Sequence, residues 1–395
     1  MASKSKYRVQ AVNHPSGEQT YLVVERISGE VDKRADRFLR SKTSGTQRTY
    51  SYRLAEYLSW RDAQPLSDDT VTLQDLERFI TSLAETTPGG PTGVAVPSAR
   101  KKPLSVSAQG SAATAIRGYY LSVYDHEKVN APLREALLAG QITRYDPVGS
   151  GEKVKRVVPK NPLAPRQVRK KPRLLPDNLW DRLAADGVLQ TARDRMIVTW
   201  LFDAGLRNGE LCGLRFADLH LRANHPCMQS KHPHVHVVKR LDNPNRAKAK
   251  TSGPPEIGED GIVRGGTIRR VSPEMLSTYW EYLTEDYHRV RALADHDMVL
   301  VVLEDGHLGD ALTTKGLRDV VKAAGKRADL GLLRPHAFRH RWATDMLRST
   351  GNSKMVAEAG GWGSTQTIED TYAHLVDTPE LEAALDRVWR KNPLA

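Results

Sequence analysis

A basic, proline-rich segment constrains the fold of this chain more than any other feature. Between Lys153 and Arg173 there are nine Lys or Arg residues, no Asp or Glu, and four prolines. Prolines interrupt helices and unpaired like charges do not enter a core, so we expect an extended, solvated connection over residues 149–175. A length of 395 residues, of which 39% are hydrophobic, can support a core on each side of it. The sequence therefore predicts two domains.

The chain before this connection predicts a small helical domain. Residues 31–148 carry apolar side chains at spacings of three and four, after alternating residues that predict a hairpin-like extension over 1–30. Thr72 is a candidate cap for the third helix of this domain, and Ser44 or Thr46 is a candidate cap for the second.

The chain after the connection, residues 176–395, predicts helices interrupted by a small sheet. Alternating stretches at 234–241 and 267–273 predict two antiparallel strands, and most of the remaining apolar spacing is helical. The tail over 377–395 predicts an amphipathic helix, which packs either on its own domain or on a neighbouring copy. The predicted fold class is mainly α with a small antiparallel β-sheet.

The net charge favours a polyanionic partner. An excess of 59 Lys+Arg over 47 Asp+Glu gives a formal charge of +12. The basic connection is then either a soluble linker or a strap that lies along phosphates. In the second case the contacts come from Lys153, Lys155, Arg156, Lys160, Arg166, Arg169, Lys170, Lys171 and Arg173.

Cysteine content and hydropathy indicate the compartment. Cys212 and Cys227 are too few for a disulfide framework, which fits a reducing environment. The sequence has no run of 18 apolar residues, and its polar N-terminus lacks the apolar core of a signal peptide. We therefore expect a cytoplasmic protein with no membrane partner.

Several residues that suit phosphate chemistry are spread through the second half of the chain. Arg207 precedes Glu210 by three positions, and His336 precedes Arg339 by three, so each pair shares a helical face. Taken singly, the first pair could equally lie in a surface turn, and the second could equally belong to a helix with a purely structural role. Taken together with Tyr372, they supply two guanidiniums for phosphate oxygens and a phenol that can act as a nucleophile.

In order, spacing and context, these residues resemble the tyrosine recombinase (phage integrase) family over about 177–375. The resemblance implies a helical, SAM-like core-binding domain at 31–148 and a catalytic domain at 176–395. It implies a site-specific recombinase or integrase that cuts and rejoins duplex DNA through a covalent 3′-phosphotyrosine, without metal, ATP or other cofactor. The implied catalytic residues are Arg207, Lys250, His336, Arg339, Trp362 and the nucleophile Tyr372, with Glu210 and His340 in support.

Some assignments within this set remain open. Lys250 is the expected general acid, and Lys248 is the alternative on the same hairpin. Trp362 stands where many relatives have histidine, so its indole N–H can donate to a phosphate oxygen but cannot carry a proton. The alternative is that Trp362 only fills a core.

A zinc site is a weaker interpretation of a histidine-rich stretch. His232, His234 and His236 alternate along a predicted strand, near Cys227 and His225. No CxxC or HxxxH spacing accompanies them, so the sequence predicts no metal.

The resemblance also implies partners. They are double-stranded DNA, a homotetramer in the synaptic complex, and an accessory excision or DNA-bending protein as an open possibility. Two other functions stay open, an inactive DNA-binding or architectural protein and a type IB topoisomerase. A bacterial or phage-encoded protein, associated with the nucleoid when on DNA, is the expected setting.

Overall fold

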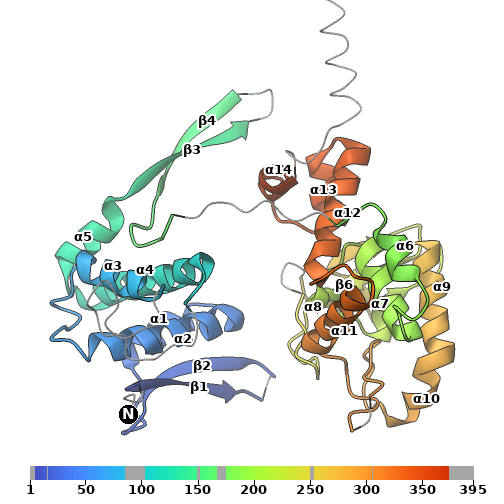
Figure 1. Cartoon of the computed structure of the whole chain (residues 1–395), viewed down its shortest axis with the longest axis horizontal. Coiled ribbons are helices and arrows are strands. Elements are labelled where there is room, and N and C mark those ends of the chain that lie inside the picture. Colours follow the sequence, from blue (N-terminus) through green and yellow to red (C-terminus); the bar gives the residue numbers. More distant parts are fainter. Residues whose placement is uncertain are drawn as a thin grey trace, which may run out of the picture. The chain divides into compact units, whose positions relative to one another are not determined.

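The computed structural model divides into two compact units, Met1–Arg169 and Lys170–Ala395 (Figure 1). For residues 141–148 and 152–159 the structure describes the backbone alone. The residues that it describes are 5–15, 17–84, 103–148, 152–166, 175–249, 253–304 and 306–372.

The first unit combines five helices with two hairpins in its described residues. The helices are α1 (Lys33–Arg40), α2 (Ser44–Arg61), α3 (Leu73–Ser82), α4 (Val106–Glu127) and α5 (Ala131–Ala139). The strands are β1 (Tyr7–Asn13), β2 (Gln19–Glu25), β3 (Gln141–Val148) and β4 (Glu152–Pro159).

Local signals explain where these helices begin. Thr72 caps α3 through a capping box with Asp75, as expected. The cap of α2 is Thr43, so the expected Ser44 or Thr46 is wrong by one or more positions. Ser44 is instead the first helical residue, and its hydroxyl donates to the Gln19 carbonyl at 2.6 Å, which ties α2 to the β1–β2 hairpin.

The basic connection was expected to be extended and solvated, and the structure differs from this in two ways. Its first part, β4, pairs antiparallel with β3 from Gln141↔Pro159 to Val148↔Glu152. Beyond this hairpin, Leu163 is buried in the core of the first unit. A two-stranded pairing satisfies backbone groups without requiring a core, so it tolerates the charges and prolines that exclude a helix.

The second unit is a bundle of helices around a small sheet. Its helices are α6 (Leu179–Ala184), α7 (Ala192–Asp203), α8 (Asn208–Leu211), α9 (Pro273–Glu281), α10 (His288–Val290), α11 (Thr314–Arg327), α12 (Pro335–Thr350), α13 (Ser353–Gly360) and α14 (Gln366–Tyr372). The unit also contains short 3-10 helices, η1 (Phe216–Asp218) and η3 (Arg291–Leu293), and a π-helix, η2 (Tyr282–Tyr287). Its strands are β5 (Leu219–His220), β6 (His234–Val237), β7 (Pro255–Ile257), β8 (Val263–Gly265) and β9 (Thr267–Arg270).

The two predicted strands of this unit are present as β6 and β9, and they pair antiparallel. The sheet has the order β5-β6-β9, so β6 is its central strand. Part of the long insertion before β9 forms a second hairpin, β7-β8, which the sequence did not indicate. The fold class predicted from the sequence is confirmed.

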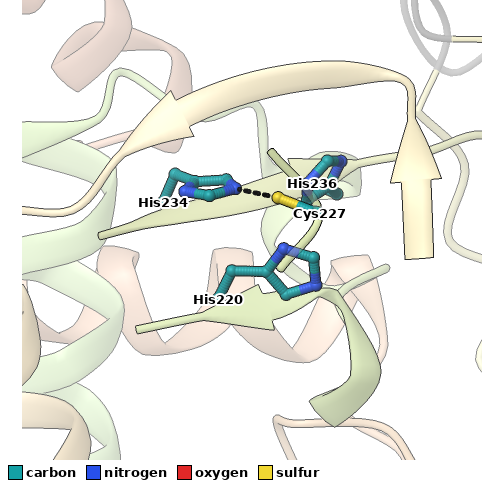
Figure 2. Close-up of side chains that lie close together, drawn as sticks. All are labelled: His220, Cys227, His234 and His236. Carbon is teal, nitrogen blue, oxygen red and sulfur yellow. Dashed lines mark hydrogen bonds between the residues drawn. The ribbon is translucent and has the colours of Figure 1, made fainter. Parts of the chain in front are cut away.

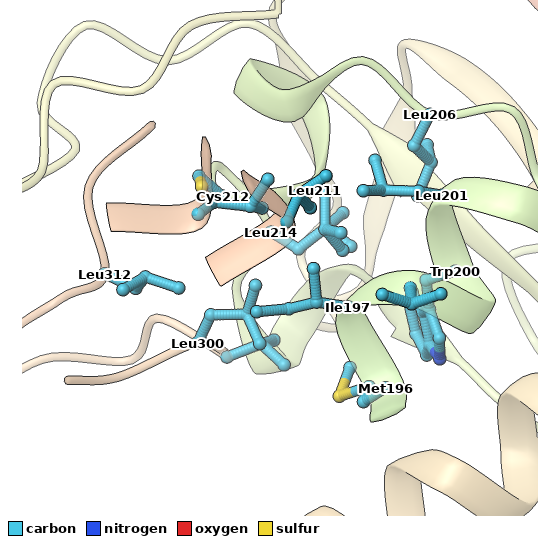
Figure 3. Packing of buried hydrophobic residues seen from close by; sticks show 14 of the residues in the cluster. Met196, Ile197, Trp200, Leu201, Leu206, Leu211, Cys212, Leu214, Leu300 and Leu312 are labelled. Carbon is cyan, nitrogen blue, oxygen red and sulfur yellow. The ribbon is translucent and has the colours of Figure 1, made fainter. Parts of the chain in front are cut away.

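The main core of the second unit lies around α7. Figure 3 shows Ile197 of this helix among Leu211, Leu214 and Leu300, with Met196 and Trp200 on the same helix beside it. Trp200 is completely buried, and its indole N–H donates to the Met275 carbonyl at 3.0 Å. None of the helices in the described ranges is long and apolar enough to cross a membrane.

Candidate active site

A buried carboxylate holds Arg207 at the start of α8. The Glu210 side chain is inaccessible to solvent, and its Oε1 accepts from Arg207 Nη1 at 2.5 Å. Its other oxygen accepts from the Arg207 backbone N–H at 2.9 Å. Arg207 keeps 23% of its side chain exposed. Glu210 therefore fixes the guanidinium of Arg207 at an accessible edge, as the GLRNGEL spacing suggested.

Arg339 lies in the interior beside this pair. Its Nη1–H donates to the Gly205 carbonyl and its Nη2–H to the Gly360 carbonyl, both at 2.6 Å. Glu210 Oε2 is 4.0 Å from Arg339 Nη1. Burial, followed by repulsion from Arg207, lowers the pKa of Arg339 to about 9. Arg339 is therefore still a cation at neutral pH, held in place by backbone oxygens.

Trp362 covers Arg339. The guanidinium carbon of Arg339 is 3.6 Å from the centroid of the Trp362 ring, a cation–π distance. The Trp342 ring stacks on Trp362, with centroids 6.2 Å apart. Because Arg339 has no exposed surface, a phosphate can reach it only after Trp362 or its neighbours move.

The candidate nucleophile lies next to a histidine. Tyr372, at the end of α14, is 2% exposed, and its hydroxyl is 2.7 Å from His340 Nδ1 on α12. Burial raises the pKa of Tyr372 to about 12, against the opposing charges of Arg339 and Arg207. Burial, followed by His336 and Arg339, lowers the pKa of His340 to about 4. A neutral imidazole therefore faces a protonated phenol.

His336 occupies the surface between this pair and a basic cleft. Its ring centroid is 4.3 Å from that of His340, one helical turn along α12. Arg207 and His336 both line the cleft, which has a volume of about 750 Å³. The basic side chains around the cleft are Arg207, Lys315, Arg318, Lys322, Arg334 and His336. Such a lining suits an anionic backbone.

A further arginine in this region was missed by the sequence reasoning. Arg269 on β9 is 3% exposed, and its guanidinium donates to the carbonyls of Ala359 and Gly360. Gly360 thereby accepts from both Arg269 and Arg339. Burial lowers the pKa of Arg269 to about 10. A single arginine in an alternating strand carries no sequence signal that separates it from surface charge.

Several expected contacts fall outside the described residues. These include Lys250, the tail helix expected over 377–395, and the basic residues Arg169, Lys170, Lys171 and Arg173. Lys153, Lys155 and Arg156 lie on β4, of which only the backbone is described, whereas Lys160 and Arg166 are exposed. The alternative acid, Lys248, is within the described chain, and its carbonyl lies close to Gly209.

The geometry thus brings together residues from α8, α12, α14 and the turn after α13. Two guanidiniums, one of them accessible, can stabilise charge on a phosphate. A phenol beside a neutral imidazole can attack phosphorus when its proton is removed. The described side chains therefore offer a nucleophile and charge stabilisation, whereas the expected general acid Lys250 lies outside the described residues.

Residues 265–378 match the model of the phage integrase family. Transposase A from transposon Tn554 of Staphylococcus aureus is 29% identical over 187 residues, which are 47% of this chain and 45% of that protein. Tyrosine recombinase XerC of Listeria welshimeri is 26% identical over 191 residues, 48% of this chain and 52% of XerC. The chain therefore spans about half the length of the curated relatives it matches.

Solved structures share the fold at lower identity. The XerH site-specific recombinase bound to palindromic difH substrate, a post-cleavage complex, has a TM-score of 0.53 at 17% identity, over 89% of this chain and 82% of that one. The Tn1549 transposon integrase in complex with a circular intermediate DNA has a TM-score of 0.54 at 15% identity, over 90% of this chain and 99% of that one. At these identities the likeness establishes a common architecture.

Proposed function

We propose that this chain, which carries a domain of the phage integrase family over residues 265–378, is a site-specific DNA recombinase or integrase. It exchanges strands between two sites through a covalent 3′-phosphotyrosine. The transposon proteins among its relatives favour movement of a mobile element as the biological role. The relatives in Staphylococcus and Listeria make a bacterial cytoplasm the proposed setting.

The observation that carries this proposal is the contact between Tyr372 and His340 beside the two guanidiniums. The tyrosine hydroxyl is 2.7 Å from an imidazole nitrogen, and the same α12 helix supplies Arg339. Arg339 and Arg207 share Glu210 as a neighbour. A DNA phosphate placed at the accessible edge of Arg207 would first contact the guanidinium of Arg207. It would reach the hydroxyl of Tyr372 only after the residues that bury this tyrosine move.

The proposed cleavage step balances as follows. The phenolic oxygen of Tyr372 forms a bond to phosphorus while the bond from phosphorus to the 5′-oxygen breaks. The phenol proton passes to His340, and the 5′-oxygen takes a proton from a general acid. Arg207 and Arg339 stabilise the charge that builds on the non-bridging oxygens. Attack of a 5′-hydroxyl on the phosphotyrosine reverses these changes and rejoins a strand.

Lys250 is our proposed general acid, with Lys248 as the alternative. His336 is proposed to orient the phosphate, because its ring lines the basic cleft together with Arg207. No step in this scheme requires a metal ion or ATP, since the protein supplies both the charge and the proton transfers.

Double-stranded DNA is the proposed partner, contacted by the cleft and by the basic residues after β4. The relatives solved on DNA include both XerH and the Tn1549 integrase. Exchange of strands between two duplexes requires two sites and a cut in each of four strands, so we propose a homotetramer. Help from an accessory excision or DNA-bending protein is compatible with this scheme.

Two alternative functions predict different products on plasmid DNA. Supercoiled plasmids carrying either two copies of the sequence that flanks the gene or no copy would be incubated with the full chain. A recombinase yields deleted or inverted product from the first plasmid only. Relaxation of both plasmids without rearrangement would instead establish a topoisomerase. Retarded migration without any change in topology would establish a binding protein, and either result would overturn the proposal.

A further inference from the structure

The strongest unexplained feature lies in the second unit, on the sheet β5-β6-β9. His220 on β5, His234 and His236 on β6, and Cys227 in the connection between these strands form a buried cluster. Their potential ligand atoms all lie within 4.8 Å of one another. Figure 2 shows the four side chains grouped together, with the sulfur of Cys227 directed at a ring nitrogen of His234.

The sheet register explains how these residues meet. His220 pairs directly with His234, so their side chains share one face of the sheet, and His236 returns to that face two residues later. The residues between them lie on the opposite face, where Val235 pairs with Leu219 and with Arg269. The cluster therefore lies on one face of the sheet, and Arg269 lies on the opposite face.

The cluster is sealed from solvent. The exposed fractions are 3% for His220, 3% for Cys227, and 0% for both His234 and His236. A cluster of imidazoles at this depth costs free energy unless each ring nitrogen has a partner. Some do not, since the buried His220 Nδ1 and His236 Nε2 lack any hydrogen-bond partner among the described groups.

The nitrogens that do have partners orient the rings inward. His236 Nδ1 lies 2.9 Å from the Gly265 carbonyl, and His234 Nδ1 lies 2.7 Å from the His232 carbonyl. A proton on each of these nitrogens donates to the carbonyl and leaves Nε2 with a lone pair. In His234 that nitrogen is 3.2 Å from Cys227 Sγ, and in His236 it is buried without a hydrogen-bond partner among the described groups. Backbone carbonyls commonly hold metal-binding histidines in this manner.

We propose that His220, Cys227, His234 and His236 form a structural zinc site. Three neutral imidazoles and one thiolate are donors that Zn²⁺ prefers, and four protein ligands leave no position for water. Ligand atoms in a tetrahedral zinc site are about 3.3–3.8 Å apart, so a modest side-chain rotation closes the cluster on an ion. One cysteine is too few for an iron–sulfur cluster. Zinc fastens the connection between β5 and β6 to the strand that pairs with β9.

This site does not depend on the proposed recombinase activity. The sequence disfavoured zinc because it offered only alternating histidines with one cysteine and no recognised spacing. His220, which completes the set, precedes them in a separate strand and joins them only through the sheet.

The test measures metals in the full chain, prepared without a histidine tag in zinc-supplemented medium. Mass spectrometry of the metal content is expected to give about one zinc per chain. Cys227→Ser and His236→Ala should each lower the zinc content at least about ten-fold. His232→Ala is the matched control, because it removes an exposed histidine from the same segment and should retain the ion. Substoichiometric zinc in the unaltered chain, or copper or iron in its place, overturns the proposal.

A second measurement starts from the unaltered chain, so its first result does not depend on whether the variants fold. Replacement of zinc by Co²⁺ in the unaltered chain should give the visible bands of tetrahedral cobalt and a near-ultraviolet thiolate-to-cobalt band. In Cys227→Ser the near-ultraviolet band should disappear, and the visible bands should weaken together with the metal content. Cobalt bands that are absent, or unchanged in Cys227→Ser, would show that the cluster does not hold the ion.

Discussion

At the scale of single residues, Trp362 joins the two halves of the candidate site. Its ring packs against Arg339 at 3.6 Å and against Tyr372 at a centroid distance of 6.3 Å. The sequence suggested an N–H donor at this position, whereas the contacts in the structure involve the face and edge of the ring. A residue that replaces Trp362 must supply an N–H group in the first role, but only an aromatic ring in the second.

Trp362→Phe should retain most of the cleavage activity, because phenylalanine still offers a ring to Arg339. Trp362→Ala should lower both activity and stability, since it opens a cavity and removes a cation–π contact worth about 0.5–2 kcal/mol. The measurements are thermal unfolding and the rate of covalent adduct formation on nicked DNA. Equal losses of activity in both variants would show that the indole N–H is needed.

His340 makes the stability of the second unit dependent on pH. Its pKa is lowered from 6.5 to about 4, so the folded state resists protonation that the unfolded chain accepts. Its contribution is therefore fully present above pH 6.5 and is lost as the pH falls through about 4. The melting temperature should decline over this window, and it should decline less in His340→Gln. His288→Gln, which alters an exposed histidine on α10, should follow the unaltered chain, and a decline unchanged in His340→Gln would contradict the assignment.

Sequence reasoning identified most of the site residues but not their surroundings. Arg207, Arg339 and Tyr372 were found because their order and local spacing resemble a known family; the family model matches residues 265–378, which include Arg339 and Tyr372 but not Arg207. Arg269 and His220 were not, since each becomes informative only when strand pairing brings it beside distant residues. Whether the predicted residues are catalytic stays a prediction.

At the scale of elements, the turn after α7 positions Arg339. Gly205 has φ +56°, and its carbonyl accepts from Arg339 Nη1. A Cβ at Gly205 would lie 2.6 Å from the Trp342 ring. The turn thus needs glycine both for its backbone conformation and for a close approach to an aromatic side chain.

Gly205→Ala should destabilise the second unit by about 2–3 kcal/mol, from strain at positive φ together with the clash. Gly187→Ala is a matched control, because Gly187 has φ +74° and nothing within 4 Å of an added Cβ. That variant should cost only about 1 kcal/mol. Denaturant unfolding measures the loss of unfolding free energy in both variants. Equal losses would show that the approach to the Trp342 ring contributes nothing.

Elements with strong local signals were the ones predicted most closely. The capping box at Thr72 and the alternation of β6 and β9 are encoded within a few residues. The β3-β4 and β7-β8 hairpins were missed, because prolines, glycines and charges in those stretches suit loops equally well. Those stretches form strands because they pair with another segment, and residues close by in the sequence do not encode that pairing.

At the scale of the whole molecule, positive charge is gathered where DNA is proposed to bind. Lys315, Arg318 and Lys322 are exposed on one face of α11 and line the cleft that contains Arg207. Their spacing of three and four places them side by side along the helix. Each can replace a counterion on a phosphate.

Lys322→Ala should weaken DNA binding at low salt and reduce the slope of log affinity against log salt by about 1. Lys315→Ala should reduce this slope by the same amount, and the double variant should reduce it by about 2. Fluorescence anisotropy of labelled duplexes over a salt series measures the slopes. Arg289→Ala, at an exposed position on α10 outside the cleft, is the control. Slopes equal to that of the control would place the DNA elsewhere.

The two units meet between Arg169 and Lys170, inside the basic segment, although Leu163 of that segment joins the core of the first unit. The composition of that segment excludes a helix and a buried strand, whereas the boundaries of each core depend on contacts such as that of Leu163 with the first unit. The central claim rests on the second unit alone, in which Tyr372 is proposed as the nucleophile.

The most direct test of that claim is capture of the covalent intermediate on a nicked suicide substrate built from the sequence that flanks the gene. We expect a protein–DNA adduct whose cross-linked peptide contains Tyr372 and which disappears in Tyr372→Phe. Tyr279→Phe, which alters another buried tyrosine of the same unit, should form the adduct normally. An adduct that persists in Tyr372→Phe, or that maps to a different residue, would contradict the account.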